Sequence, residues 1–248
     1  MDIITSFINF FNFSKRLSKL NGDLILSVAS PSNYSELDSG SLLYKYCLSA
    51  ALNYPQYIDY ITSHDFSLHQ DFKYLKRTYS EHYAFLYSFV KQINALSVVE
   101  IGTFRGLASR VMIDASPNVH VTTYDIHSYT EFDHLLDESY FLSGRLQQHL
   151  CDLSIYDTFM QHLDVFNSAD LIFLDGPKDS SFEKVFLKFL SCSSFVRKQR
   201  YLVIDDIKFS NMLKNWFSIF SPKFDATSIG HWSGTGVIDI SDGLDFRY

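Results

Sequence analysis

From residue 97 onward, short apolar runs alternate with amphipathic segments, and this alternation restricts the possible folds more than any other feature. Two of the runs, at 171–175 (LIFLD) and 201–206 (YLVIDD), are apolar along almost their whole length and end in acids. Such strands are buried on both faces, as in a parallel sheet covered by helices. Between them lies one apolar helical face, formed by Phe182, Val185, Phe186, Phe189 and Leu190. The sequence therefore predicts an α/β domain with a doubly wound, mostly parallel sheet.

Seven segments are expected to form the strands of this sheet, and helices are expected between them. The predicted strands are residues 97–101, 119–125, 149–153, 171–175, 201–206, 224–229 and 237–240. The predicted helices are residues 81–95, 107–115, 140–148, 182–190 and 212–220. Residues 1–80 are predicted to be mainly helical and to form an N-terminal extension or cap, with the sheet domain at 81–248.

Composition and charge exclude several classes of protein. The chain has 248 residues, 46% of them hydrophobic, which suffices for one large α/β domain with an extension. A net charge of −7 without a basic stripe argues against binding nucleic acid or an anionic membrane. Cys47, Cys151 and Cys192 form no C-x-x-C pair, so we expect reduced thiols in a cytoplasmic protein.

The first residues of the chain carry an apolar run of about 13 residues, too short to span a bilayer. Basic residues follow the run rather than precede it, which does not fit a signal peptide. Five apolar residues recur there at helical spacing: Ile3, Ile4, Phe7, Ile8 and Phe11. We expect a helix that packs on the domain or forms a homodimer, with binding at a membrane surface as the alternative and no stable insertion.

A glycine-containing turn follows the first predicted strand. It reads Glu100-Ile-Gly102-Thr-Phe-Arg-Gly106. Gly102 permits a tight turn and close approach of a ligand, and Gly106 lets the next helix begin near the sheet. Asp125 ends the next predicted strand, where a carboxylate can accept hydrogen bonds from both hydroxyls of a ribose. The pattern predicts a site for a nucleotide-like ligand.

Two cofactor classes use this layout. A dinucleotide site has the pattern G-x-G-x-x-G, whereas this chain has G-x-x-x-G preceded by Glu100, which suits a ligand with cationic groups better than a pyrophosphate. The E-x-G-x-x-x-G form resembles motif I of the class I S-adenosylmethionine-dependent methyltransferases, a resemblance that covers roughly residues 81–240. It implies a Rossmann-like methyltransferase fold, with Asp125 on the ribose and Asp152 facing the adenine. The implied cofactor site comprises Glu100, Gly102, Thr103, Phe104, Gly106, Asp125, Ile126, Asp152 and Asp175.

Three acids end two neighbouring predicted strands. Asp175 ends one, and Asp205 and Asp206 end the next, so one strand–helix–strand crossover can bring the three together. Converging carboxylates repel one another unless a cation joins them. All-oxygen ligation suits Mg²⁺, with Mn²⁺ or Ca²⁺ as alternatives. We therefore expect a divalent metal bound by Asp175, Asp205 and Asp206.

The segment Asp175-Gly-Pro-Lys178 looks like the one after strand four in catechol-type O-methyltransferases. There an aspartate binds the metal and a lysine three residues on acts as base, which implies these roles for Asp175 and Lys178. The Asp205-Asp206 pair is also similar to sugar O-methyltransferases and to the cephalosporin-hydroxylase-like group. One departure is Ala108, where catechol-type enzymes often carry a serine near the methionine carboxylate, so that Ser109 or a backbone amide would have to replace it.

The loop 230–236 (GHWSGTG) joins the last two predicted strands, and the resemblance places it beside the metal. His231 could hydrogen-bond or deprotonate a hydroxyl, and Trp232 could stack on a ring. The leading hypothesis is a metal-dependent O-methyltransferase acting on a hydroxyl of a small molecule or glycan. Two alternatives stay open: an NAD-type oxidoreductase or epimerase, and a non-catalytic methyltransferase-like binding module.

Overall fold

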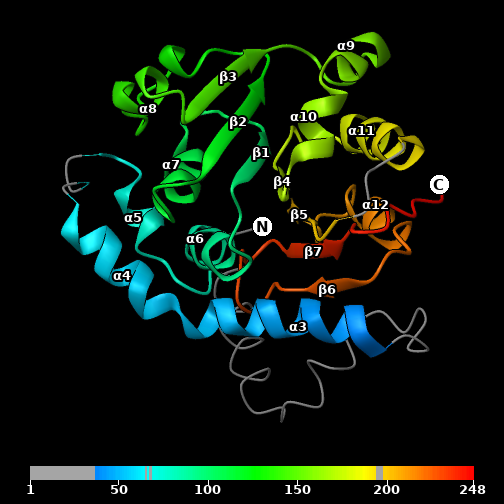
Figure 1. Ribbon diagram of the computed structural model, residues 1–248, viewed down its shortest axis with the longest axis horizontal. Helices are drawn as coiled ribbons and strands as arrows, with labels where there is room; N and C mark the ends of the chain where they lie inside the picture. The colour runs from blue at the N-terminus through cyan, green and yellow to red at the C-terminus, as the bar shows by residue number, and fades with distance from the viewer. Residues whose placement is uncertain (1–36, 65, 67–68, 194–197) are drawn as a thin grey trace, which may run out of the picture.

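The computed structural model describes residues 37–64, 66, 69–193 and 198–248, and their central feature is a seven-stranded sheet between helices (Figure 1). Its strands follow one another in the order β3-β2-β1-β4-β5-β7-β6. Strand β7 is antiparallel to both of its neighbours, and the other pairs are parallel. The strands are β1 (Ser97–Ile101), β2 (His120–Asp125), β3 (Leu146–Leu150), β4 (Leu171–Leu174), β5 (Tyr201–Asp205), β6 (Lys223–Asp225) and β7 (Thr235–Asp239). The predicted Rossmann-like methyltransferase fold is confirmed.

Helices precede the sheet and connect its strands. Those before β1 are α3 (Leu37–Leu52), α4 (Tyr54–Ser63), α5 (Phe72–Leu75) and α6 (Tyr83–Gln92). Those between the strands are α7 (Leu107–Asp114), η1 (Tyr129–Glu131), α8 (Glu138–Leu142), α9 (Tyr156–Gln161), α10 (Leu163–Ser168), α11 (Ser181–Cys192) and α12 (Leu213–Phe217). Among the described residues, no helix has the length and apolar character needed to cross a bilayer.

Alternate side chains of the central strands enter two separate hydrophobic cores. Val98 packs with α3, α4, α6 and α7, whereas its neighbour Val99 packs with α9, α10, α11 and α12. Because strand side chains alternate between the faces, both faces of β1, β4 and β5 are buried. This explains the near-continuous apolar sequences of those strands. The layers also fix the carboxyl ends of β1, β2, β4 and β5 at one edge of the sheet.

The helices before the sheet share its first core. Leu43 and Tyr57 are buried in the same cluster as Phe173 of β4 and Val237 of β7. Figure 1 shows α3 running alongside β6, and the Tyr57 hydroxyl donates to the Leu75 carbonyl at 2.7 Å. The division of the chain at residue 80 stays a prediction. The predicted N-terminal helix lies outside the described residues.

The third strand lies three residues earlier than predicted. Strand β3 covers Leu146–Leu150 rather than 149–153, and the helix before it ends at Leu142 rather than near 148. As an edge strand, β3 is paired only with β2, and its side chains after Leu146 are exposed or half-buried. Its polar sequence LQQHL therefore does not carry the apolar pattern that identified the central strands. The three cysteines are free thiols, as predicted.

Candidate active site

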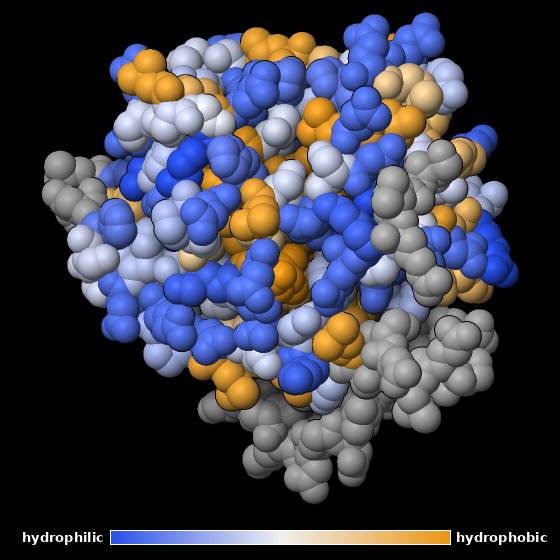
Figure 2. Space-filling model, in the orientation of Figure 1, coloured by the Kyte–Doolittle hydropathy of each residue, from blue (hydrophilic) through white to orange (hydrophobic). Residues whose placement is uncertain are grey.

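A cavity of about 710 Å³ opens at the carboxyl edge of the sheet, a size typical of small-molecule sites. Its walls come from the segments that follow β1, β2, β3 and β4 and from the start of α11. Figure 2 shows an apolar area near the middle of the viewed face, bordered by hydrophilic side chains. Of the predicted cofactor residues, six line the cavity: Gly102, Phe104, Asp125, Ile126, Asp152 and Asp175. Glu100, Thr103 and Gly106 are not among the lining residues.

Asp125 is fixed at the cavity by two backbone amides. Its Oδ2 accepts from the Phe104 amide at 2.9 Å, and its Oδ1 accepts from the His127 amide at 3.0 Å. A carboxylate offers about four lone-pair directions, so each oxygen can accept a further hydrogen bond from a ligand. This geometry suits a pair of vicinal hydroxyls, the role predicted for Asp125.

Gly102 allows the turn after β1 to pack directly on the segment after β4. Its φ is +101°, and a Cβ at this position would overlap the backbone carbonyl oxygen of Asp175. Both residues line the cavity. Glycine is therefore required here by its backbone conformation and by close contact with another part of the chain, in addition to any ligand.

Glu100 is turned away from the cavity and lies beneath α7. Its side chain is buried, with the residue 1% exposed, and it accepts hydrogen bonds from the Ser109 hydroxyl and from Thr123 Oγ1 at 2.6 Å. Burial raises the pKa of Glu100 to about 8, although the two hydroxyls oppose the shift. Ser109 is committed to this network, so the structure does not leave it free to replace the serine missing at position 108.

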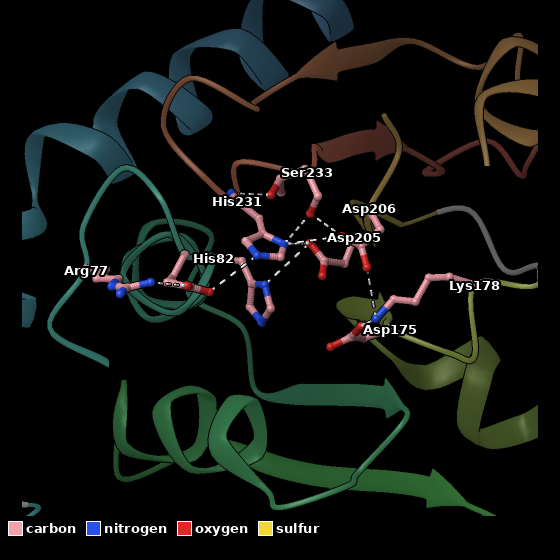
Figure 3. Close-up of polar contacts among 10 residues, drawn as sticks. Arg77, His82, Asp175, Lys178, Asp205, Asp206, His231 and Ser233 are labelled. Atoms are coloured by element: carbon pink, nitrogen blue, oxygen red, sulfur yellow. Dashed lines mark hydrogen bonds and ion pairs between the residues drawn. The ribbon is translucent and has the colours of Figure 1, made fainter. Parts of the chain in front are cut away.

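The three predicted metal ligands do converge. One carboxylate oxygen from each of Asp175, Asp205 and Asp206 lies within 4.8 Å of the others. The Lys178 ammonium contacts Asp175 and lies 3.1 Å from Asp206 Oδ2 (Figure 3). Burial would lower the pKa of Lys178, but the surrounding carboxylates outweigh it and raise that pKa. Lys178 is thus a protonated cation that partly neutralises the acids.

Three residues at the cavity and the acidic cluster have an unusual backbone conformation. Lys178, Asp206 and Phe104 have φ values of +56°, +61° and +44°, in the left-handed region that residues other than glycine seldom adopt. The buried Glu183 carboxylate holds the loop that carries Lys178. It accepts from the amides of Lys178 at 2.7 Å and Ser180 at 3.0 Å.

His231 reaches the same cluster from the loop before β7. Its Nδ1 lies 3.1 Å from Asp205 Oδ1 and 2.7 Å from the Ser233 hydroxyl, and its Nε2 lies 3.4 Å from Glu81 Oε2. Burial favours the neutral ring, but Asp205, Asp206 and Glu81 together raise the pKa of His231 to about 10. The carboxylates around His231 thus favour the protonated form of its ring.

Two residues of the cluster were missed by the sequence interpretation. Glu81 and His82 directly precede α6, and His82 Nδ1 lies 3.4 Å from Asp205 Oδ1. Figure 3 shows the His82 and His231 rings side by side, both directed at Asp205. The sequence feature that could have identified them is the placement of a charged residue, Glu81, and a polar one, His82, next to α6, a helix whose residues are mostly buried. The strand-based motifs did not extend to this position.

The glycines of the loop 230–236 allow close contacts with other parts of the chain. A Cβ at Gly230 would overlap Thr235, one at Gly234 would overlap Ile207 and Lys208, and one at Gly236 would overlap Trp216. The Trp232 side chain remains 51% exposed, with its ring centroid 5.6 Å from that of His231. An aromatic surface thus borders the acidic cluster.

Comparison with known proteins finds a family that resembles part of the sheet domain. Residues 99–207 match a family described as a methyltransferase domain. A search of curated protein sequences returns no match.

Solved structures with a similar fold include three examples of low identity. A Staphylococcus aureus protein assigned as a caffeoyl-CoA O-methyltransferase has 15% identity over 78% of this chain and 99% of its own, with a TM-score of 0.48. The Bacillus cereus O-methyltransferase in complex with SAH has 16% identity over 65% and 79%, with a TM-score of 0.44. The MycE methyltransferase in complex with Mg, SAH and mycinamycin VI has 18% identity over 45% and 28%, with a TM-score of 0.36.

The family match covers the glycine turn after β1, Asp125, Asp175 and the acids after β5. The sheet order and the cavity at the carboxyl ends of its strands fit the same assignment. Residues 99–207 are therefore similar to a methyltransferase domain, and the fold of the sheet agrees with that similarity.

Proposed function

We propose that the protein transfers a methyl group from S-adenosylmethionine to a hydroxyl oxygen of a small molecule or glycan, with the help of a divalent cation. The observation that carries the proposal is the convergence of Asp175, Asp205 and Asp206 with Lys178. Two of these residues, Asp175 and Lys178, line the cavity. A methyltransferase domain that only binds its cofactor has no need for three carboxylates in one place, because their mutual repulsion destabilises the fold.

The cavity residues are suited to hold the cofactor. Asp125 can accept from the ribose hydroxyls through the lone pairs that the two backbone amides leave available. Ile126, Leu153 and Phe182 supply apolar surface for an adenine ring. Asp152 lies on the same wall and can accept from the exocyclic amine. S-adenosylmethionine would supply an electrophilic methyl group to the acceptor.

The carboxylates of Asp175, Asp205 and Asp206 are suited to hold Mg²⁺ or Mn²⁺, since they offer a compact all-oxygen donor set. A divalent cation held there would lower the pKa of an acceptor hydroxyl, and its charge would lower those of nearby bases. Lys178 now occupies part of this space, so it has to move away from Asp175 and Asp206 to admit the cation. The loop that carries it, anchored by Glu183, would keep it at the cavity wall.

Removal of the hydroxyl proton falls to Lys178 or His231. Both lie beside the carboxylates and carry a proton while these acids are their counter-ions, so either group would have to release that proton before it accepts one from the acceptor hydroxyl. Lys178 lines the cavity, which favours it as the group that faces the acceptor oxygen. His231 is anchored by Asp205 and Glu81 and is better placed to orient the acceptor.

The surroundings of His231 favour a polar acceptor with a ring. Trp232 presents an exposed aromatic face, and Phe209 lies next to it with ring centroids 6.2 Å apart. Sugars and aromatic alcohols both stack on such surfaces. Kinetic constants of His231→Ala and Trp232→Ala test this placement once an acceptor is known. Unchanged kcat/KM in both variants would place the acceptor elsewhere.

The proposal is tested by following methyl transfer from labelled S-adenosylmethionine to a panel of sugars, glycosides and catechols. Mg²⁺ is expected to support product formation and a chelator to abolish it. Asp206→Asn should lose turnover while retaining cofactor binding, measured by calorimetry. A matched control is Asp179→Asn, since Asp179 also lines the cavity but lies outside the acidic trio. Full activity in excess chelator would rule out the metal, with Lys178 acting in its place.

A further inference from the structure

His82 is a buried side chain without a hydrogen-bond partner among the described residues. The residue is 4% exposed, and neither ring nitrogen makes a hydrogen bond within that part of the chain. Its Nδ1 nevertheless points at Asp205 Oδ1 from 3.4 Å. Leaving a buried polar group unsatisfied is costly, so a histidine in this state calls for a ligand.

The two distances from Asp205 to the histidines fall in the range found between ligands of one metal ion. Metal–nitrogen and metal–oxygen bonds of about 2.0–2.2 Å place adjacent ligand atoms roughly 3.0–3.5 Å apart. Asp205 Oδ1 lies 3.4 Å from His82 Nδ1 and 3.1 Å from His231 Nδ1. Ligand atoms of all three residues lie within 4.8 Å of one another.

Glu81 supplies the outer contact that metal-binding histidines usually have. Its Oε2 lies 3.4 Å from Nε2 of His231, whereas Asp205 faces the other ring nitrogen, Nδ1. Metal-ligating histidines commonly donate their other ring N–H to a carboxylate, which fixes the tautomer and leaves the facing nitrogen free to bind the metal. Arg77 in turn contacts Glu81 at 3.4 Å.

We propose that His82, Asp205 and His231 form a second cation site, one that selects a transition-metal ion such as Zn²⁺, Mn²⁺ or Fe²⁺ over Mg²⁺. Two imidazoles and a carboxylate are the donor set that such ions prefer, whereas Mg²⁺ prefers oxygen ligands. This site shares only Asp205 with the acidic trio. A cation can enter it while Lys178 stays on Asp175 and Asp206.

The site is tested with Co²⁺ as a spectroscopic probe, added to full-length, metal-stripped protein in the presence of excess Mg²⁺. We expect one Co²⁺ per chain, with visible absorption, and displacement by Zn²⁺. His82→Ala and His231→Ala should weaken Co²⁺ binding at least about 100-fold, and Glu81→Gln about 10-fold. Asp175→Asn lies outside the site and His120→Ala is a distant, exposed histidine, so both should bind Co²⁺ as the wild type does.

Equal Co²⁺ affinity in wild type and His82→Ala, or displacement of Co²⁺ by Mg²⁺, would overturn the proposal. Loss of binding in Asp175→Asn to the same degree as in His82→Ala would also overturn it, because the ion would then lie in the acidic trio. If His82→Ala does not fold, X-ray absorption of the Zn²⁺-loaded wild type decides: two imidazole ligands are expected, and none contradicts the site. Neither measurement uses S-adenosylmethionine or an acceptor, so failure here is distinct from failure of the methyl-transfer proposal.

Discussion

Replacing Glu100 by glutamine tests the finding that this acid is a buried structural group rather than a cofactor ligand. Glu100 is 1% exposed and bonded to Ser109 and Thr123, and burial raises its pKa from 4.5 to about 8. The folded protein therefore keeps the proton at pH values where the unfolded chain has lost it. The contribution of Glu100 to the free energy of unfolding is therefore fully present below pH 4.5, and it is lost as the pH rises toward 8.

The size of this effect follows from the pKa shift. Each pKa unit corresponds to about 1.4 kcal/mol, so the shift of Glu100 weakens the fold by on the order of 4 kcal/mol between these pH values. Glutamine has nearly the same shape, accepts the same two hydrogen bonds and does not ionise. Glu100→Gln should thus equal the wild type in stability at pH 5 and exceed it by about 3 kcal/mol at pH 8.

Urea denaturation of both proteins across this pH range measures the difference directly. Calorimetry should give an affinity for S-adenosylmethionine that changes by less than about threefold, because Glu100 does not line the cavity. Thr123→Val, which removes one hydroxyl from the network, serves as a control for general loss of packing. If the free energies of unfolding of wild type and Glu100→Gln change with pH in the same way, the raised pKa is refuted. If Glu100→Gln loses S-adenosylmethionine binding, Glu100 is a cofactor ligand after all.

The positions of three further residues predict the effects of replacing them. Asp125→Ala should weaken S-adenosylmethionine binding at least about tenfold in calorimetry, because charge-assisted hydrogen bonds to the ribose are lost; equal affinity would remove Asp125 from the site. Lys178→Met should lower kcat far more than cofactor affinity in a methyl-transfer assay, and equal turnover would make Lys178 a structural counter-ion only. Gly102→Ala should cost at least about 2 kcal/mol in denaturant unfolding, because its Cβ overlaps Asp175; wild-type stability would refute the close packing.

The sequence predicted the parts of the fold that are buried on both faces. Strands β1, β4 and β5 were found within one residue because their apolar runs reflect burial by two helical layers. Strand β3 was misplaced because an edge strand keeps polar side chains on its accessible face, while the apolar Leu153 that attracted the prediction lies beyond it.

The candidate site was predictable where it depends on strand ends and not where it depends on packing. Asp175, Asp205 and Asp206 follow strands whose order the crossover rule gives, so their convergence could be anticipated. Glu81 and His82 reach the acidic cluster only because α6 packs on one face of the sheet. This is a tertiary contact, and no local sequence pattern predicts it. The hydrogen bonds of Glu100 to Ser109 and Thr123 likewise depend on how α7 and β2 pack against β1.

The most direct test of the methyltransferase assignment is calorimetric titration of the full-length protein with S-adenosylmethionine and with NAD, each with and without Mg²⁺. The cavity geometry and the family match predict saturable, one-to-one binding of S-adenosylmethionine and none of NAD. Binding should persist without Mg²⁺, since the residues expected to hold the ribose lie outside the acidic trio. Saturable binding of NAD together with no detectable binding of S-adenosylmethionine would contradict the assignment.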